Sequence, residues 1–194
     1  MRYGICHRKS AHGFTLIEVL ITLVILAIGL LGLAGLQIFS LQSQMEAYQR
    51  GQAVMLAEEM AKRMQVNAPA ARDGEYTEGE QYGLLPAQVC DPAALSTADY
   101  DLCDWNNILA GQGVALAGIN VGSIAAARGC IENIAGSADG ETRIRVTVAW
   151  QGNAATQAPG SPCGTGQYGA DDAYRRVAIV DAVFADLLED PNSP

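Results

Sequence analysis

Residues 13–18 read Gly-Phe-Thr-Leu-Ile-Glu and lead directly into an apolar run, residues 19–36. Those eighteen positions carry no charge, and Thr22 is their one clearly polar side chain. As a helix rising about 1.5 Å per residue, the segment from Phe14 to Phe39 is long enough to cross a hydrocarbon core of about 30 Å. Glu18 is the exception, because a carboxylate just inside an apolar segment is costly and is by default a functional hypothesis. The stretch therefore predicts a membrane-spanning helix with one functional acid near its start.

The order of features around Gly13 differs from that of an ordinary secretory signal. Such a signal is cleaved after its apolar region at small residues; Ala34-Gly35 imitates a site of this kind, but the apolar run is too long. The stretch instead resembles the class III signal of type IV pilins, a short basic leader ending in Gly, then Phe-Thr-Leu-Ile-Glu and a hydrophobic helix. The resemblance implies that a prepilin peptidase cleaves between Gly13 and Phe14 and methylates the new N-terminus. It also implies an assembly role for Glu18, which becomes the fifth residue of the processed chain.

The composition excludes several kinds of function. The chain of 194 residues has a formal charge of −9, and its first thirteen residues hold three of the twelve basic residues, so the processed chain has 9 basic and 21 acidic residues, or −12. Such an acidic chain repels nucleic acid, whose phosphates are bound by clustered Lys and Arg. Both histidines, His7 and His12, precede the cleavage point. Without them the processed chain lacks Ser-His, Cys-His and His-ligated metal chemistry. We therefore expect no enzyme, no cofactor and no metal.

A membrane-tethered periplasmic enzyme is the alternative to that expectation. It would depend on carboxylates, hydroxyls, tyrosine and lysine alone. Scattered carboxylate pairs such as Asp171-Asp172 lack convergent partners in the sequence. The sequence therefore favours a structural protein over an enzyme.

Cysteine usage indicates an exported head with disulfides. Cys6 belongs to the leader, and four cysteines remain, widely spaced and outside any paired metal-binding pattern: Cys90, Cys103, Cys130 and Cys163. An even set of this kind in an exported chain predicts two disulfides rather than a zinc site. Four cysteines allow three pairings, and we favour Cys90–Cys103 with Cys130–Cys163. The first closes a short loop at a helix start, and the second ties a strand to a Gly-rich loop.

The helix should continue beyond the apolar run, from Phe14 to Asn67, because the sequence holds helix formers and no proline until Pro69. Two stripes follow its second half, the first being Leu41, Met45, Tyr48, Gln52, Met55 and Glu59, and the second Val54, Leu56, Met60 and Met64. The apolar face thus drifts round the helix near Gly51, where we expect contact with other subunits to give way to contact with the head.

Three glycines recur inside the apolar run: Gly29, Gly32 and Gly35. Small residues let helix backbones approach closely in lipid. Each glycine also costs about 1 kcal/mol of helix propensity, which favours melting or bending, and the family resemblance implies helix flexibility here. The two explanations are compatible, and both stay open.

The remaining chain predicts an α+β head. Residues 69–95 are expected to form a loop, and residues 97–110 a short amphipathic helix capped by Ser96 and Asp99, with Trp105 as a core anchor. Three strands are expected at residues 125–134, 142–150 and 175–186. In the second, Ile144, Val146, Val148 and Trp150 alternate with Arg143, Arg145 and Thr147, as in a half-buried antiparallel strand. A turn at residues 136–140 and a long loop at residues 152–173 connect the strands, and the tail from Leu187 should fray.

Beyond the signal, nearly the whole chain resembles the PilV family of minor pilins. The resemblance is carried by residues 30–37, 56–67, 105–106, 129–132 and 145–150 and by the basic start of the last strand. It implies an inner-membrane protein of a Gram-negative bacterium that primes type IV pilus assembly and sits at the pilus tip. The partners it implies are other minor pilins, the major pilin, prepilin peptidase and inner-membrane lipid. A minor pseudopilin of type II secretion, which shares the signal and the helix, is the alternative.

The expected architecture is accordingly a type IV pilin-like α+β fold, a long N-terminal helix packed on a small antiparallel sheet with disulfides. Its divisions are a leader (residues 1–13), the transmembrane half of the helix (14–38), the amphipathic half (39–68), a globular periplasmic head (69–190) and a tail (191–194).

Overall fold

The computed structural model describes residues 13–77, 81–83, 88–112, 115–116, 119–120, 124–134 and 141–185. Residues 1–12 of the expected leader, the turn at residues 136–140 and the tail from Leu187 lie outside these ranges. The chain divides into two compact units, Met1–Ser43 and Gln44–Pro194, which we treat separately.

Helix α1, Leu16–Val66, begins in the first unit and ends in the second. The helix expected from Phe14 to Asn67 is thus confirmed to within two residues at each end. Its buried residues begin at Ala53 and follow one face of the helix: Ala53, Leu56, Ala57, Met60, Ala61 and Met64. By contrast, Met45, Tyr48 and Met55 of the first expected stripe are exposed. The stripe of Leu56, Met60 and Met64 therefore belongs to the core of the head, as the drift of the apolar face predicts.

A short helix, α2, Ala68–Arg72, follows α1 and corrects the expected loop at residues 69–95. Pro69 stands in its first turn, where proline favours a helix start because the missing N–H would be unpaired there in any case. Helix α3, Thr97–Leu109, matches the expected helix. Its first turn is capped by Ser96 Oγ, which accepts a 3.1 Å hydrogen bond from the backbone N–H of Asp99.

The head contains a three-stranded antiparallel sheet in the order β3-β4-β5. Its strands are β3, Arg128–Asn133, β4, Glu141–Gln151, and β5, Arg175–Ala185. A separate small hairpin pairs β1, Ala115–Leu116, with β2, Ile119–Asn120, and the sequence analysis missed it. Strand β3 begins three residues later than expected, because the preceding residues form a turn in which Ala126 has φ 51°.

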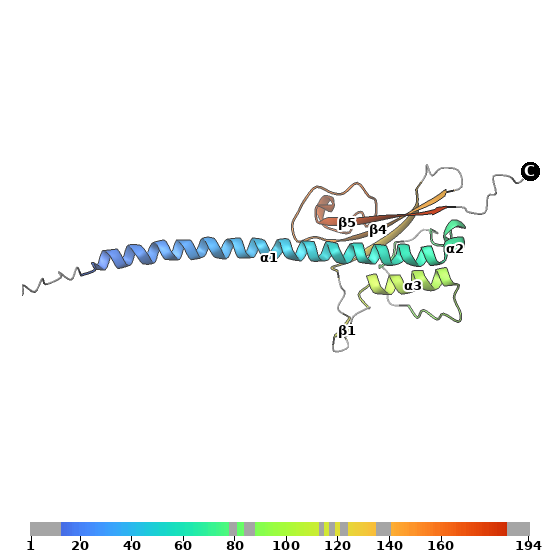
Figure 1. Cartoon of the computed structure of the whole chain (residues 1–194), viewed down its shortest axis with the longest axis horizontal. Coiled ribbons are helices and arrows are strands. Elements are labelled where there is room, and N and C mark those ends of the chain that lie inside the picture. Colours follow the sequence, from blue (N-terminus) through green and yellow to red (C-terminus); the bar gives the residue numbers. More distant parts are fainter. Residues whose placement is uncertain are drawn as a thin grey trace, which may run out of the picture. The chain divides into compact units, whose positions relative to one another are not determined.

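The core of the head lies between the sheet and the helices. In Figure 1 the C-terminal part of α1 lies between β4 and β5 on one side and α3 on the other. The even-numbered face of β4 packs against this core, with Ile144, Val146, Val148 and Trp150 all buried. Trp105 is fully buried and donates a 3.0 Å hydrogen bond from Nε1 to the carbonyl of Leu56. The expected core anchor is therefore confirmed.

Gly129 allows β3 to approach α3. A Cβ at this position would overlap the side chains of Trp105 and Leu109. Only glycine fits this crossing without displacing the indole ring.

The opposite face of the sheet corrects the expectation of a half-buried strand. At its C-terminal end Thr147 and Ala149 are buried as well, because the long loop after β4 folds back over them. Tyr168 and Cys163 form a second small apolar cluster with Ala149. The loop includes one turn of 3-10 helix, η1, Ala170–Asp172.

These elements confirm the predicted fold class. A long N-terminal apolar helix, a small antiparallel sheet and two disulfides agree with a type IV pilin-like α+β fold.

Candidate functional site

The expected cleavage point lies just before the helix. Gly13, Phe14 and Thr15 precede α1 and have no regular secondary structure, and Phe14 is 84% exposed. Glu18 lies in the first helical turn, where its backbone N–H donates to the carbonyl of Thr15 at 3.1 Å. A carboxylate in the first turn interacts favourably with the positive end of the helix dipole. The bond that a peptidase would cut is therefore accessible, and the acid follows it by one turn.

The apolar run behind Glu18 is exposed throughout. Every Val, Leu, Ile and Phe from residue 14 to residue 41 has an exposed side chain. In the part of the chain that the structure describes, α1 is the one helix long and apolar enough to cross a membrane. A continuous apolar surface of this size requires lipid or other protein chains around it.

The helix runs without interruption through the three glycines of the apolar run. A Cβ added at Gly29, Gly32 or Gly35 would meet no atom of this chain within 4 Å. No close contact with another part of this chain therefore requires glycine at these three positions. Close packing with another helix and local flexibility both remain hypotheses.

Both disulfides are present in the favoured pairing. Cys90–Cys103 joins the loop before α3 to that helix, and Cys130–Cys163 joins β3 to the loop after β4. Each bond thus attaches an irregular segment to a regular element of the head.

An ion-pair cluster joins α3 to α1. Arg63 contacts Glu59 on its own helix at 2.7 Å and reaches Asp104 and Asp101 of α3 at 2.6 and 3.5 Å. Burial acts to lower the pKa of the Arg63 guanidinium, but its hydrogen bonds to Glu59 and Asp104 raise the pKa above its usual value. Tyr76 completes the cluster by donating to Asp101 at 2.8 Å. Arg63 was not expected to have this role from the sequence, although Asp101 and Asp104, three residues apart on α3, offered a signal.

Two neighbouring arginines organise the loop after β4. Arg175 is 4% exposed, and its guanidinium donates to the carbonyls of Pro159, Ser161 and Cys163. Arg176 forms a 2.5 Å ion pair with Glu46 of α1. These contacts fix the loop and the start of β5, and sequence reasoning read the same pair only as the basic start of a strand.

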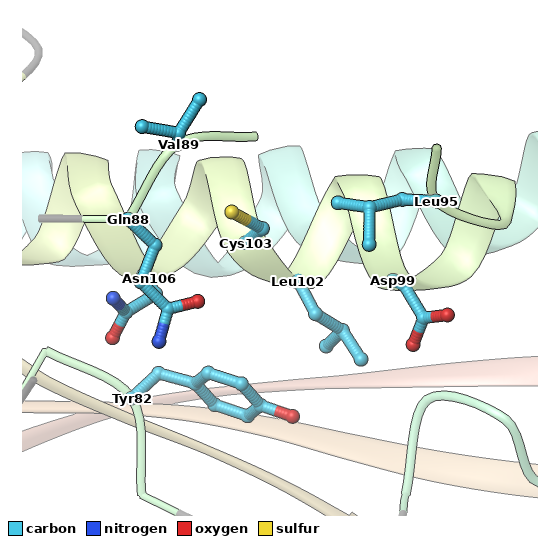
Figure 2. Close-up of a pocket in the computed structure, with 8 residues that line it drawn as sticks. All are labelled: Tyr82, Gln88, Val89, Leu95, Asp99, Leu102, Cys103 and Asn106. Carbon is cyan, nitrogen blue, oxygen red and sulfur yellow. The ribbon is translucent and has the colours of Figure 1, made fainter. Parts of the chain in front are cut away.

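A cavity of about 310 Å³ lies beside α3. It is lined by Tyr82, Gln88, Val89, Leu95, Asp99, Leu102, Cys103 and Asn106. Figure 2 shows the Tyr82 ring facing Leu102, with Val89 turned away from both. The one carboxylate, that of Asp99, accepts a hydrogen bond from Ser96 at 2.8 Å. The lining therefore brings together no pair of groups suited to acid–base or nucleophilic catalysis.

The described residues contain no group of three or more Asp, Glu, Cys or His side chains that could hold a metal ion. Asp171 and Asp172 have separate surroundings, since Asp172 is buried beside Arg175 and accepts hydrogen bonds from the Gly166 N–H.

A family model described as the prokaryotic N-terminal methylation motif matches residues 8–34. The match contains the Gly13-Phe14 bond, Glu18 and most of the apolar run. It supports a type IV pilin-like protein that is anchored in a membrane, is processed by prepilin peptidase and acts with pilus components. No curated protein and no solved structure matches the chain.

Proposed function

We propose that the chain is a minor pilin of the PilV type, which joins other minor pilins to prime type IV pilus assembly and sits at the pilus tip. The observation that carries the proposal is the N-methylation motif at residues 8–34, at the start of a helix whose large apolar side chains are all exposed from Leu16 to Leu41. A structural subunit of this kind acts through contacts with other subunits and is not an enzyme. Before assembly it is a single-pass protein of the inner membrane of a Gram-negative bacterium, with its head in the periplasm.

We expect the Glu18 carboxylate to pair the helix with the helix of an adjacent subunit. Within the residues that the structure describes, no side chain forms an ion pair with its carboxylate. Cleavage before Phe14 creates an amine, and the amine of an adjacent subunit offers the opposite charge. Two opposite charges in a low-dielectric site offset part of each other's desolvation, whereas either alone stays costly. The pairing also fixes the axial register of adjacent helices, which an entirely apolar seam specifies poorly.

Replacing Glu18 tests this assembly role. The Glu18→Ala and Glu18→Gln variants should be cleaved and reach the membrane at normal levels, while their co-purification with partner pilins falls. Thr22→Ala is the matched control, because the Thr22 hydroxyl donates to the Val19 carbonyl of its own helix, one turn away at 2.8 Å. A tip subunit lacks a neighbour above it and needs one of the two contacts, so the defect should be milder than in a major pilin.

Normal co-purification of the cleaved Glu18→Ala protein would eliminate the pairing role. Glu18 would then lie solvated at the level of the lipid headgroups and serve peptidase recognition alone.

A minor pseudopilin of type II secretion is the second candidate, because the motif and the apolar helix suit both systems. Pilus genes or secretion genes beside the coding sequence distinguish the two. Co-purification with components of one system and not the other gives the same answer in the protein itself.

A further inference from the structure

Strand β5 leaves one side of the sheet open. The far edge of β3 is bridged by Tyr82, whose backbone exchanges hydrogen bonds of 2.8 and 3.0 Å with Gly129. Among the described residues, by contrast, no segment pairs with the far edge of β5 along its length. At the very end of the strand, the Arg72 guanidinium donates to the carbonyl of Ala185 at 3.5 Å.

The hydrogen bonds of β4 identify which backbone groups face this open edge. The carbonyl of Arg143 accepts from Ile134, and the N–H of Gln151 donates to Ala125, both on the β3 side. Backbone groups alternate in direction along a strand. The odd-numbered residues of β4 therefore point toward β3, and the even-numbered ones toward β5.

The register carries this alternation into β5. Even-numbered β4 residues lie opposite the even-numbered residues of β5, as in the pair Val146 and Val180. These pairs form the ladder between the two strands. The N–H and C=O groups of Ile179, Asp181 and Val183 consequently point away from β4, toward the open edge.

The same three residues present exposed side chains. Ile179 and Val183 are 45% and 47% exposed. Between them, Asp181 accepts hydrogen bonds from Nε and Nη2 of Arg145 at 2.8 and 2.9 Å. Residues 177–185 contain no proline and no lysine, two of the usual protections of an edge strand, and Asp181 is their one charged side chain. An edge of this length, with an apolar side chain on each side of its one acid, is suited to pairing with a further strand.

Asp181 determines which strand fits. In antiparallel pairing with a second copy, the register that opposes Ile179 with Val183 also places Asp181 opposite Asp181. Like charges directly opposite each other destabilise a strand pair, and opposite charges stabilise it. The acid therefore disfavours self-association and favours a strand with a cation at that position.

We propose that the β5 edge binds an extended segment of a different protein chain, in which a Lys or Arg is flanked at alternate positions by apolar residues. The backbone groups of Ile179, Asp181 and Val183 form the hydrogen bonds to the added strand. Their side chains determine which sequence of that strand binds. The proposal is independent of the assembly role of Glu18, which concerns the N-terminal helix. Failure of one therefore leaves the other standing.

Two blocked, fluorescently labelled peptides test it: Thr-Val-Thr-Lys-Thr-Val-Thr, and the same sequence with Glu in place of Lys. Each is titrated by anisotropy into the full-length protein in detergent micelles. The Lys peptide should bind about fivefold more tightly or better, because an attractive cross-strand pair replaces a repulsive one. Equal binding of the two peptides, or no binding of either, would overturn the proposal.

Variants at the edge separate backbone pairing from a general surface effect. Ile179→Pro and Val183→Pro remove outward N–H groups while leaving the β4 ladder intact, so the Lys peptide should no longer bind. Ile179→Thr retains the N–H and is the matched control. Retained binding by both proline variants would contradict pairing at this edge.

Exchanging the two charges of the Arg145–Asp181 pair gives a second test, which remains valid even if the proline variants do not fold. Arg145→Glu combined with Asp181→Arg keeps the ion pair and reverses the charge at the edge. The preference should then invert toward the Glu peptide. An unchanged preference, or a stable dimer of the wild-type chain that the proline variants abolish, would overturn the proposal in favour of another site or a second copy.

Discussion

The first unit and the head use apolar side chains in opposite ways. From Leu16 to Leu41 every large apolar residue is exposed, whereas in the head Met60, Trp105 and Ile144 are completely buried. The head thus has an apolar core within its own fold, whereas the first unit depends on lipid or on other chains to cover its apolar side chains. The processing motif lies at the start of the dependent unit. The difference teaches that the head can fold around its own core, whereas the first unit needs other molecules to cover its apolar surface.

The largest effect should come from the cleavage point. In wild-type membranes the chain should begin at methylated Phe14, and Gly13→Val should abolish this form because it removes the glycine after which the resemblance places the cut. Mass analysis of the N-terminus distinguishes the two. Gly29→Ala is the control, since a Cβ there meets nothing within 4 Å and cleavage should be normal. A wild-type N-terminus near Gly35 would instead indicate ordinary secretion.

Two methionines of α1 test where the exposed part of this helix ends and its buried part begins. Met60 is fully buried and Met55 is 63% exposed. Met60→Ala should lower the free energy of unfolding of the head by about 2–5 kcal/mol, and Met55→Ala by less than about 0.5 kcal/mol. Denaturant unfolding followed by tryptophan fluorescence measures both. Comparable losses would place Met55 in the core and contradict the comparison.

Much of the fold was predictable because its signals are local. The apolar run, the capping of α3 by Ser96 and the strand over residues 142–150 each depend on neighbours in sequence, and the structure confirms all three. The processing motif is local as well, and the matched residues 8–34 contain the Gly13–Phe14 bond at which we expect cleavage.

The features that sequence reasoning missed depend on distant residues. By alternation Thr147 was expected to face solvent, but it is buried, and Cys163 of the loop 16 residues later lies against its carbonyl. Arg63 meets acids 38 and 41 residues away. The open edge of β5 exists only because of the strand order. No window of sequence contains these partners together.

The disulfides sharpen the comparison, since both lie in the head. Replacing Cys130 and Cys163 together with Ser should lower the unfolding free energy by about 2–4 kcal/mol. The pair Cys90 and Cys103 closes a shorter loop, 13 rather than 33 residues apart in sequence. In the chain-entropy model its loss should cost about 0.8 kcal/mol less. Alkylation without reduction should label none of the four cysteines in the exported wild-type protein; labelling of all four would contradict an oxidised head.

The smallest effect concerns two buried tyrosines of the head. Burial raises the pKa of Tyr76 to about 12, although the hydrogen bond from Asn67 acts to lower it. Burial likewise raises the pKa of Tyr168 to about 12. Tyrosines in the unfolded chain ionise near pH 10. A raised pKa in the folded state means that the contribution to stability is complete below that pH and is lost as the pH rises toward 12. Rapid absorbance titration of tyrosinate should therefore show a component near pH 12 that Tyr76→Phe and Tyr168→Phe together remove, while stability declines from pH 10 upward. Absence of a component above pH 11 in the folded wild-type head, or its retention in the double variant, would contradict the burial of these two hydroxyls. The head would then lack, at these positions, the buried interior by which it differs from the exposed first unit.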